Sequence, residues 1–256
     1  MRAIVILTLI LSLTIAAAAQ DLSTRSLQKL LDCPIAGGPE ARSYEFELRA
    51  FPAGGVLAGF TVGLIKRFQI GVSYGGTDVI GYNKPEWNPA PGVSAQFRLL
   101  NESTALPALA FGFVNQGYGG WDSDKDRYQY KAKGFYAALG KYFQVMNLGD
   151  VGFHSGVNQN ALTGKDQRLD FWLASDYHLT EQVAVIAEYS AAINDQGQEQ
   201  SFSEGHGYLN AAVRWSFGQR LAIDLILRDL LVNLNDQSRG GKQLGRELRM
   251  CYVENF

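Results

Sequence analysis

The sequence contains only three histidines and two cysteines in 256 residues, and this scarcity excludes several kinds of site. No His or Cys cluster has the spacing of a metal site. A hydrolase needs a nucleophile, a base and an orienting group within hydrogen-bond reach. His154 stands beside Ser155, which strand alternation turns to the opposite face, while His178 and His206 lie in connectors. We therefore expect no cofactor, no metal and no catalytic residue.

The chain also lacks a strong charge of either sign. Lys and Arg number 23 against 25 Asp and Glu, which gives a net charge of -2 and no field that would steer nucleic acid. Beyond the first 20 residues there is no run of about eighteen apolar residues, so we expect no membrane-spanning helix in the mature chain. Nucleic-acid binding is not expected.

The first 20 residues, MRAIVILTLILSLTIAAAAQ, have one basic residue, an apolar stretch and then small residues. This order is typical of a secretory signal peptide, here assigned to residues 1–20 with cleavage after Ala19 or Gln20. An uncleaved membrane anchor is the alternative. No lipoprotein-type cysteine stands at the junction.

The segment 21–42 follows the signal peptide and precedes the first expected strand. Within it, Leu27, Leu30 and Leu31 stand at helical spacing behind a Ser23/Thr24 cap. This pattern predicts a periplasmic segment with a short helix, and a plug inside a barrel lumen is the alternative.

From residue 43 onward the apolar residues recur with a period of two. The segment YEFELRAF at 44–51 alternates aromatic or apolar residues with charged ones, and about twelve such segments follow one another to the end of the chain. Their length, roughly nine to eleven residues, is that of a tilted strand crossing a bilayer. One of them, LAIDLILRDLL from Leu221, fits a helical stripe as well as a strand.

The connectors alternate between short and long. Short turns such as IKR at Ile65 and GQR at Gly218 alternate with long polar loops such as those from Thr77, Asn115 and Asn194. The first connector, FPAGG, is an exception, because it is short although it falls among the long loops. An even strand count with this asymmetry predicts a transmembrane antiparallel up-and-down β-barrel over 43–256, in the outer membrane of a Gram-negative-type cell. One alternative is an outer-membrane lipid- or sugar-modifying enzyme. The other is a soluble periplasmic β-protein, with the apolar face turned inward.

In a membrane barrel the apolar face points to lipid and the charged face lines the lumen. The charged face forms either an ion-pair network that packs a narrow lumen or a constriction that binds a charged or sugar-like solute. The candidate lumen-binding residues are Glu45, Glu47, Arg49, Arg98, Asp170, Glu188, Arg214, Asp224, Arg228 and Arg249. Side chains can fill the interior of a barrel of about eight strands, whereas a barrel of about sixteen to eighteen strands keeps a water channel. A barrel of about twelve strands lies between these sizes, so we expect a narrow or blocked pore.

The last strand, RELRMCYVENF, runs to the final residue. Tyr252 and Phe256 are typical of the C-terminal signal that the outer-membrane insertion machinery recognises, whereas Glu254 departs from it. Outer-membrane lipid and that machinery are therefore expected partners. Cys33 and Cys251 are candidates for a disulfide, because export leads to an oxidising compartment; two free thiols are the alternative.

One stretch supports a resemblance to a known family. The phrases FPAGGVLAGFTVGLIKRFQIGVSYGGTDVIG and NPAPGVSAQFRLLNESTALPALAFGF, within residues 43–119, resemble the start of YjbH-like outer-membrane barrels. That class is linked to exopolysaccharide production. The resemblance implies a non-enzymatic barrel accessory to surface polysaccharide export, with polysaccharide as a further partner. A narrow solute pore is the function expected from the residues themselves.

Overall fold

The computed structural model of the chain describes residues 27–145, 149–160, 162–163, 166–196, 201–218, 220–236 and 244–256. The signal peptide expected at 1–20 lies outside them, and within them no helix is long and apolar enough to span a bilayer. In chain order the elements are β1 (Ser43–Phe51), β2 (Gly55–Ile65), β3 (Phe68–Thr77), β4 (Glu86–Trp87), β5 (Gly92–Leu100), β6 (Ala108–Val114), β7 (Tyr118–Asp122), β8 (Arg127–Tyr130), β9 (Gly134–Val145), β10 (Gly149–Gln159), β11 (Asp170–His178), β12 (Val183–Ser190), η2 (Ile193–Asp195), β13 (Tyr208–Phe217), β14 (Leu221–Arg228) and β15 (Gly245–Asn255).

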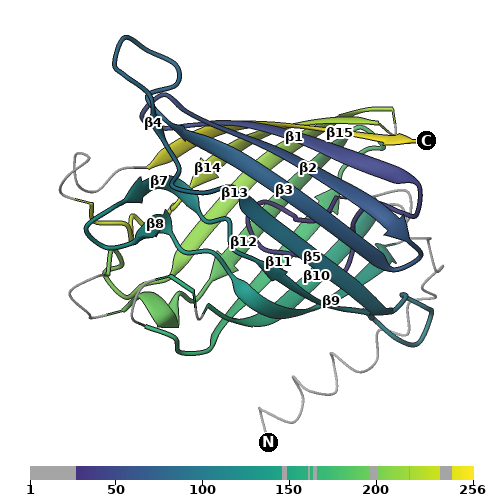
Figure 1. The fold of residues 1–256 in the computed structure, drawn as a ribbon. Helices are drawn as coiled ribbons and strands as arrows, with labels where there is room; N and C mark the ends of the chain where they lie inside the picture. The colour runs from purple at the N-terminus through teal and green to yellow at the C-terminus, as the bar shows by residue number, and fades with distance from the viewer. Residues whose placement is uncertain are drawn as a thin grey trace, which may run out of the picture.

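Twelve strands form a closed antiparallel barrel (Figure 1). Each of β1, β2, β3, β5, β6 and β9 to β15 pairs with the next strand in this order, and β15 pairs back onto β1. At this seam the register runs from Ser43 opposite Asn255 to Ala50 opposite Leu248. The predicted twelve-stranded up-and-down barrel is confirmed.

The segment with ambiguous periodicity is a strand. β14 pairs with β13 along one edge and with β15 along the other, and Asp224 stands opposite Arg214 and Arg249 in the two ladders. The helical alternative is wrong. In a strand, Asp224 points into the lumen together with every second residue of β14, and this places its carboxylate beside the arginines of both neighbouring strands.

The outer surface of the barrel is apolar. The large exposed hydrophobic residues on the strands include Phe46, Leu48, Phe60, Val72, Phe97, Phe111, Leu139, Phe153, Val157, Phe171, Leu173, Val185, Val213, Trp215, Leu225 and Leu248. Most of the residues between them are polar or small and point inward, with Trp172, Ile186 and Ile226 as larger apolar exceptions. Such an inverted distribution, with a closed hydrogen-bond ladder, is stable only where hydrocarbon replaces water around the barrel. The barrel therefore spans the outer membrane, and the soluble alternative is wrong.

The two rims differ as the sequence predicts. The first residue of β1 and the last residue of β15 lie at the rim where Lys66 and Arg67 join β2 to β3. This rim carries the short turns, and short turns face the periplasm in outer-membrane barrels. The opposite rim carries the long connectors, including β4, the β7–β8 hairpin and η2. The period-two pattern does not predict the β7–β8 hairpin, which pairs with itself and not with the barrel wall.

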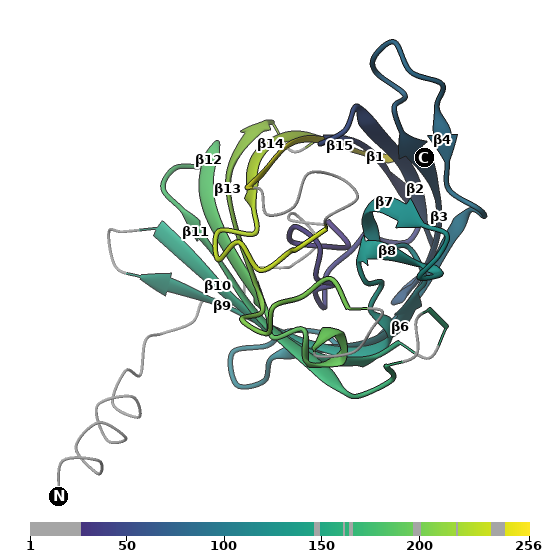
Figure 2. The ribbon, with the colours of Figure 1, turned by 90° about the vertical axis from the view of Figure 1, so that its left-hand side faces the viewer.

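Residues 27–38 lie inside the barrel, and we call this segment the plug. Figure 2 looks along the barrel and shows its purple trace in the centre of the lumen. It forms a tight turn in which Leu30 N donates to the Cys33 carbonyl oxygen at 3.2 Å, with Lys29 opposite Pro34. The short helix expected in 21–42 is wrong for residues 27–42, which contain none, and the Ser23/Thr24 cap lies outside the described residues. The alternative of a lumenal plug is correct for residues 27–38.

Candidate functional site: a plugged lumen

The barrel wall holds the plug through its main chain. Glu188 on β12 accepts hydrogen bonds from the amide nitrogens of Leu31, Asp32 and Cys33, at 3.2, 3.1 and 2.9 Å to Oε2. A single carboxylate thus satisfies three successive donors at the tip of the turn. Glu45 on β1 adds a fourth such bond, accepting from the amide of Gln28 at 3.0 Å. A helix is therefore not needed to satisfy these donors.

Arginine and glutamine side chains satisfy the plug's carbonyl groups. Arg249 Nη1 donates to the Leu31 oxygen at 2.8 Å, and Arg214 Nη2 donates to the Leu30 oxygen at 2.9 Å. At the periplasmic end, the Gly37 oxygen accepts from Nε2 of Gln96 at 2.6 Å and of Gln69 at 3.3 Å, while Gly38 accepts from Arg98 at 3.3 Å.

Two side chains of the plug form buried ion pairs with the wall. Lys29 Nζ lies 2.9 Å from Glu47, and the Asp32 carboxylate lies 2.9 Å from Arg49 and 2.6 Å from Arg228. Burial alone would raise the pKa of Asp32, but Arg228 and Arg49 outweigh it and hold this pKa well below the ordinary range. Asp32 is therefore ionised in the closed barrel at neutral pH.

Apolar contacts complete the fit. Leu30, Leu31 and Ile35 are buried against wall residues of β11 to β14, and Leu31 has no exposed surface. The wall residues of this cluster are Ala174, Ile186, Ala212 and Ile226. Small inward side chains on these strands leave the space that the plug's larger ones fill.

The ten lumen-binding candidates all lie on the inner side of the wall, and most form pairs with each other or with the plug. Asp224 is hydrogen-bonded by Arg214 Nε at 2.8 Å and by Arg249 Nε at 2.8 Å. Asp170 lies 3.7 Å from Lys133 and accepts from the Ser190 hydroxyl at 3.2 Å. The interpretation of an ion-pair network therefore describes the closed lumen, although the network packs a chain segment and not an empty tube.

Cavities lie above and below the plug. At the periplasmic mouth a cavity of ≈ 450 Å³ is lined by residues that include Glu40, Lys66, Arg67 and Arg98. On the extracellular side a chamber of ≈ 40 Å³ reaches Asp32 and has room for on the order of three waters at the volume that one buried water requires. The plug thus separates a wide periplasmic vestibule from a smaller chamber on the extracellular side.

The long-loop rim covers this chamber. Arg127 on β8 is buried and forms an ion pair with Asp195 of η2, whose Oδ2 also accepts from the Tyr208 hydroxyl at 2.9 Å. Lys131 Nζ donates to the carbonyl oxygens of Asp166 and Asn194, at 2.7 and 2.9 Å. These contacts fasten the hairpin β7–β8 across the opening.

A cluster of three titratable side chains on β10 and β11 was not predicted. Asp176 lies between two imidazoles, 2.8 Å from His154 Nε2 and 2.8 Å from His178 Nε2. Alternation places all three on one face, but only the register of β10 with β11, with Gly152 opposite Asp176, shows that they meet. His178 closes β11 and is not in the turn where the sequence places it.

The candidate disulfide is not formed, and the alternative of two free thiols describes the structure. Cys33 and Cys251 are both free and buried. Cys33 packs with Tyr136 and Trp172 on the β9–β11 side, whereas Cys251 on β15 stands opposite Glu47 on β1. Seam closure brings the strand ends together, but the plug carries Cys33 to another part of the wall.

The C-terminal aromatic residues lie at the periplasmic end of the seam. Phe256 N donates to the Arg42 oxygen at 2.8 Å, and its ring lies 6.4 Å from that of Tyr44. The ring of Tyr252 lies 6.4 Å from the same Tyr44 ring. Glu254, the departure from the expected signal, is paired with Arg220 at 2.9 Å. Recognition by the insertion machinery stays a prediction.

Comparison with known proteins finds likeness in shape and little in sequence. No family model matches the chain, and no curated sequence matches it. Three solved structures are similar. The NanC porin has 8% sequence identity and a TM-score of 0.48, and the match covers 83% of this chain and 99% of that one. Omp33 of Acinetobacter baumannii has 10% identity and a TM-score of 0.46, with 85% of this chain and 99% of that one covered, and the KdgM porin has 10% identity and a TM-score of 0.45, with 82% and 98% covered. Because these TM-scores are below 0.5, the assignment of the barrel rests on its own strand pairing and its two faces.

Proposed function

We propose that the protein is a narrow outer-membrane pore for small solutes, closed by its own N-terminal plug. The observation that carries the proposal is that a polar lumen, lined with charged side chains, is filled by a peptide segment held entirely by noncovalent contacts. A barrel with only a structural role could fill its lumen with its own wall side chains.

The contacts of the plug favour a removable gate. Its main-chain groups and two ionic side chains are bound by carboxylates, guanidinium groups and amides that would all be solvated by water after it leaves. The vestibule of ≈ 450 Å³ already admits water to its periplasmic side. The role in surface polysaccharide export that the resemblance to YjbH-like barrels implies stays a prediction.

The test is conductance of the purified full-length protein in planar bilayers. Wild type is expected to open rarely. Glu188→Ala removes the acceptor of three amide groups, two of them buried. A buried amide left unsatisfied costs about 1–3 kcal/mol, so the variant is expected to give long-lived open channels.

Glu181→Ala is the matched control, because Glu181 is exposed in the β11–β12 turn and should leave conductance as in wild type. Heat-modifiable gel migration establishes that each variant is folded. If folded Glu188→Ala and Leu31→Ala proteins, which each loosen the plug by a different contact, both conduct no more than wild type, the pore proposal is overturned.

A further inference from the structure

Two arginines from different strands converge on one carboxylate in the lumen. Arg49 on β1 and Arg228 on β14 are each 1% exposed, and β15 lies between their strands. Glu247 on β15 accepts from Nε of both, at 2.6 Å in the case of Arg49. Glu247 takes the Nε group of each arginine, and terminal nitrogens of both arginines face Asp32 of the plug, although Arg228 Nη2 also donates to Glu247 at 3.2 Å. We call Arg49 and Arg228 the arginine clamp.

Aromatic rings hold the clamp in place. The Tyr118 ring centroid lies 4.5 Å from the guanidinium carbon of Arg49 and 5.2 Å from that of Arg228. The Tyr130 ring centroid lies 4.4 Å from the guanidinium carbon of Arg228. Stacking of this kind stabilises a planar guanidinium without using its N–H donors. The donors therefore stay available for an anion.

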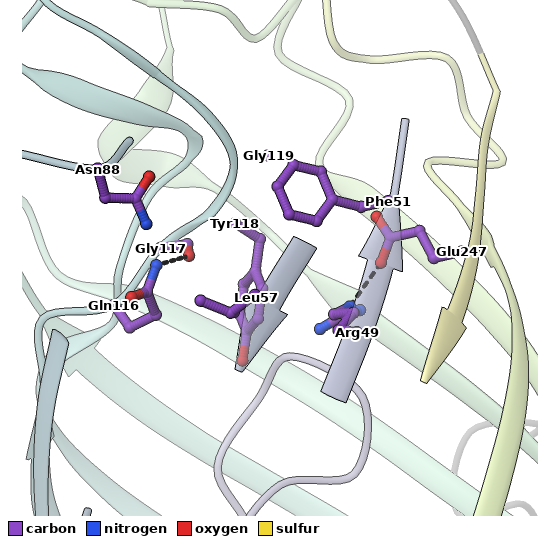
Figure 3. A pocket seen from close by; sticks show the side chains of 9 residues that line it. All are labelled: Arg49, Phe51, Leu57, Asn88, Gln116, Gly117, Tyr118, Gly119 and Glu247. Carbon is purple, nitrogen blue, oxygen red and sulfur yellow. Dashed lines mark hydrogen bonds and ion pairs between the residues drawn. The ribbon is translucent and has the colours of Figure 1, made fainter. Parts of the chain in front are cut away.

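The clamp offers more donors than Asp32 uses. Arg49 Nη1 is buried and has no hydrogen-bond partner among the residues that the structure describes. A cavity of ≈ 10 Å³ lies beside it, lined by Arg49, Tyr118, Glu247 and neighbouring residues (Figure 3). Figure 3 also shows the bond from Arg49 to Glu247 that orients the guanidinium. A ligand with more acceptor atoms than one aspartate side chain would find a further donor here.

The charge balance also depends on Asp32. Within the clamp, two guanidinium groups face the carboxylates of Glu247 and Asp32. Departure of the plug removes Lys29 as well as Asp32, so it frees Glu47 and leaves the two guanidinium groups of the clamp with one carboxylate, that of Glu247. A carboxylate-bearing solute would replace the partner that Asp32 provides. Bidentate donors of this geometry match carboxylates.

We propose that the arginine clamp is a binding site for the carboxylate group of a small solute, and that Asp32 occupies it in the closed barrel as an internal substitute for that solute. This inference rests on the proposed pore, because the solute reaches the clamp only when the plug moves. A carboxylate-bearing solute then competes with Asp32 and favours the open state.

Cys33 provides the measurement, because this plug thiol is 1% exposed and can react only when the plug has moved. In a Cys251→Ala background, its labelling by a polar maleimide is followed with sodium D-glucuronate, D-glucose, phosphate or chloride at matched ionic strength. A tethered carboxylate competes at an effective concentration on the order of millimolar, so the glucuronate range extends to about 100 mM. Glucuronate is expected to accelerate labelling by roughly tenfold, whereas glucose and chloride leave it unchanged.

Two variants test the clamp directly. Asp32→Asn removes the internal carboxylate and is expected to lower the half-maximal glucuronate concentration by at least about tenfold. Arg228→Lys keeps the charge but loses the fork of donors, so the glucuronate response is expected to disappear. Arg220→Lys is the control, because Arg220 pairs with Glu254 at the rim, and it keeps the full response.

The outcomes separate the inference from the pore proposal. Equal acceleration by glucose or chloride, or a full response in Arg228→Lys, would overturn the carboxylate site even if Glu188→Ala conducts. A stronger response to phosphate than to glucuronate would assign the clamp to phosphate and also overturn it. Glucuronate-dependent labelling in a protein whose variants never conduct would support the site and reject the pore.

Discussion

Replacing Leu31 by alanine is expected to release the plug by an amount that can be worked from its burial. Leu31 has no exposed surface and packs in one cluster with Leu30, Ile35 and the wall residue Ile186. A Leu→Ala change at such a site costs about 2–5 kcal/mol, because apolar contacts are lost and a cavity remains. At about 1.4 kcal/mol per factor of ten, the docking equilibrium falls roughly 30-fold to several-thousand-fold.

The assay is again maleimide labelling of Cys33 in a Cys251→Ala background. When plug movement is fast relative to the chemistry, the labelling rate follows the fraction of molecules with the plug released. We expect the Leu31→Ala protein to label at least about 30-fold faster than the same background with Leu31. The matched control is Leu225→Ala, because Leu225 is on β14 and 62% exposed to the lipid side.

An unchanged labelling rate in a folded Leu31→Ala barrel would refute this reasoning, since it would show that the apolar cluster contributes nothing to closure. An equal acceleration in Leu225→Ala would also refute it. That result would mean that labelling reports general loosening of the barrel and not release of the plug.

Two further predictions concern the wall and the extracellular rim. Gly156→Ala is expected to destabilise the barrel by about 1–3 kcal/mol, because the new Cβ would lie 2.1 Å from the buried Trp172 ring. Gly59→Ala is the control and should be tolerated, because its Cβ would have its nearest neighbour at 3.6 Å. The unfolding temperature of each variant on heated gels checks both. Burial and the charge of neighbouring Arg127 lower the pKa of Lys131 to about 8. The rate at which Lys131 is acylated should therefore rise with pH with a midpoint near pH 8, and a midpoint near 10.5 would contradict this. Since the folded pKa is below the unfolded value, Lys131 opposes folding below pH 8, and the penalty fades as the pH rises to 10.5.

The barrel could be predicted from the sequence because its signal is local. Alternation along 44–51 already separates Phe46 and Leu48, which face lipid, from Glu45 and Glu47, which are buried inside. The inner position of the charged residues follows from the same alternation once lipid is taken as the surrounding solvent.

The sequence offers a lumenal plug only as an alternative to a short helix, because the plug's partners come from distant parts of the chain. The spacing of Leu27, Leu30 and Leu31 is compatible with a helix, but the amide groups are satisfied by Glu188, about 155 residues further along the chain. Pairing of His154 with Asp176 likewise depends on the register between two strands, which alternation leaves undetermined. Whether Cys33 reaches Cys251 is likewise undetermined by the sequence, since the path of residues 27–38 decides where Cys33 lies.

The position of Asp32 has a consequence for how the cylinder is assembled. Its carboxylate joins Arg49 on the first strand to Arg228 on β14, and these strands flank β15, which closes the cylinder. Docking of the plug therefore adds a contact between the two strands that the closing strand joins. We expect docking of the N-terminal segment and closure of the seam to stabilise one another, which links biogenesis of the protein to the same contact that keeps it shut.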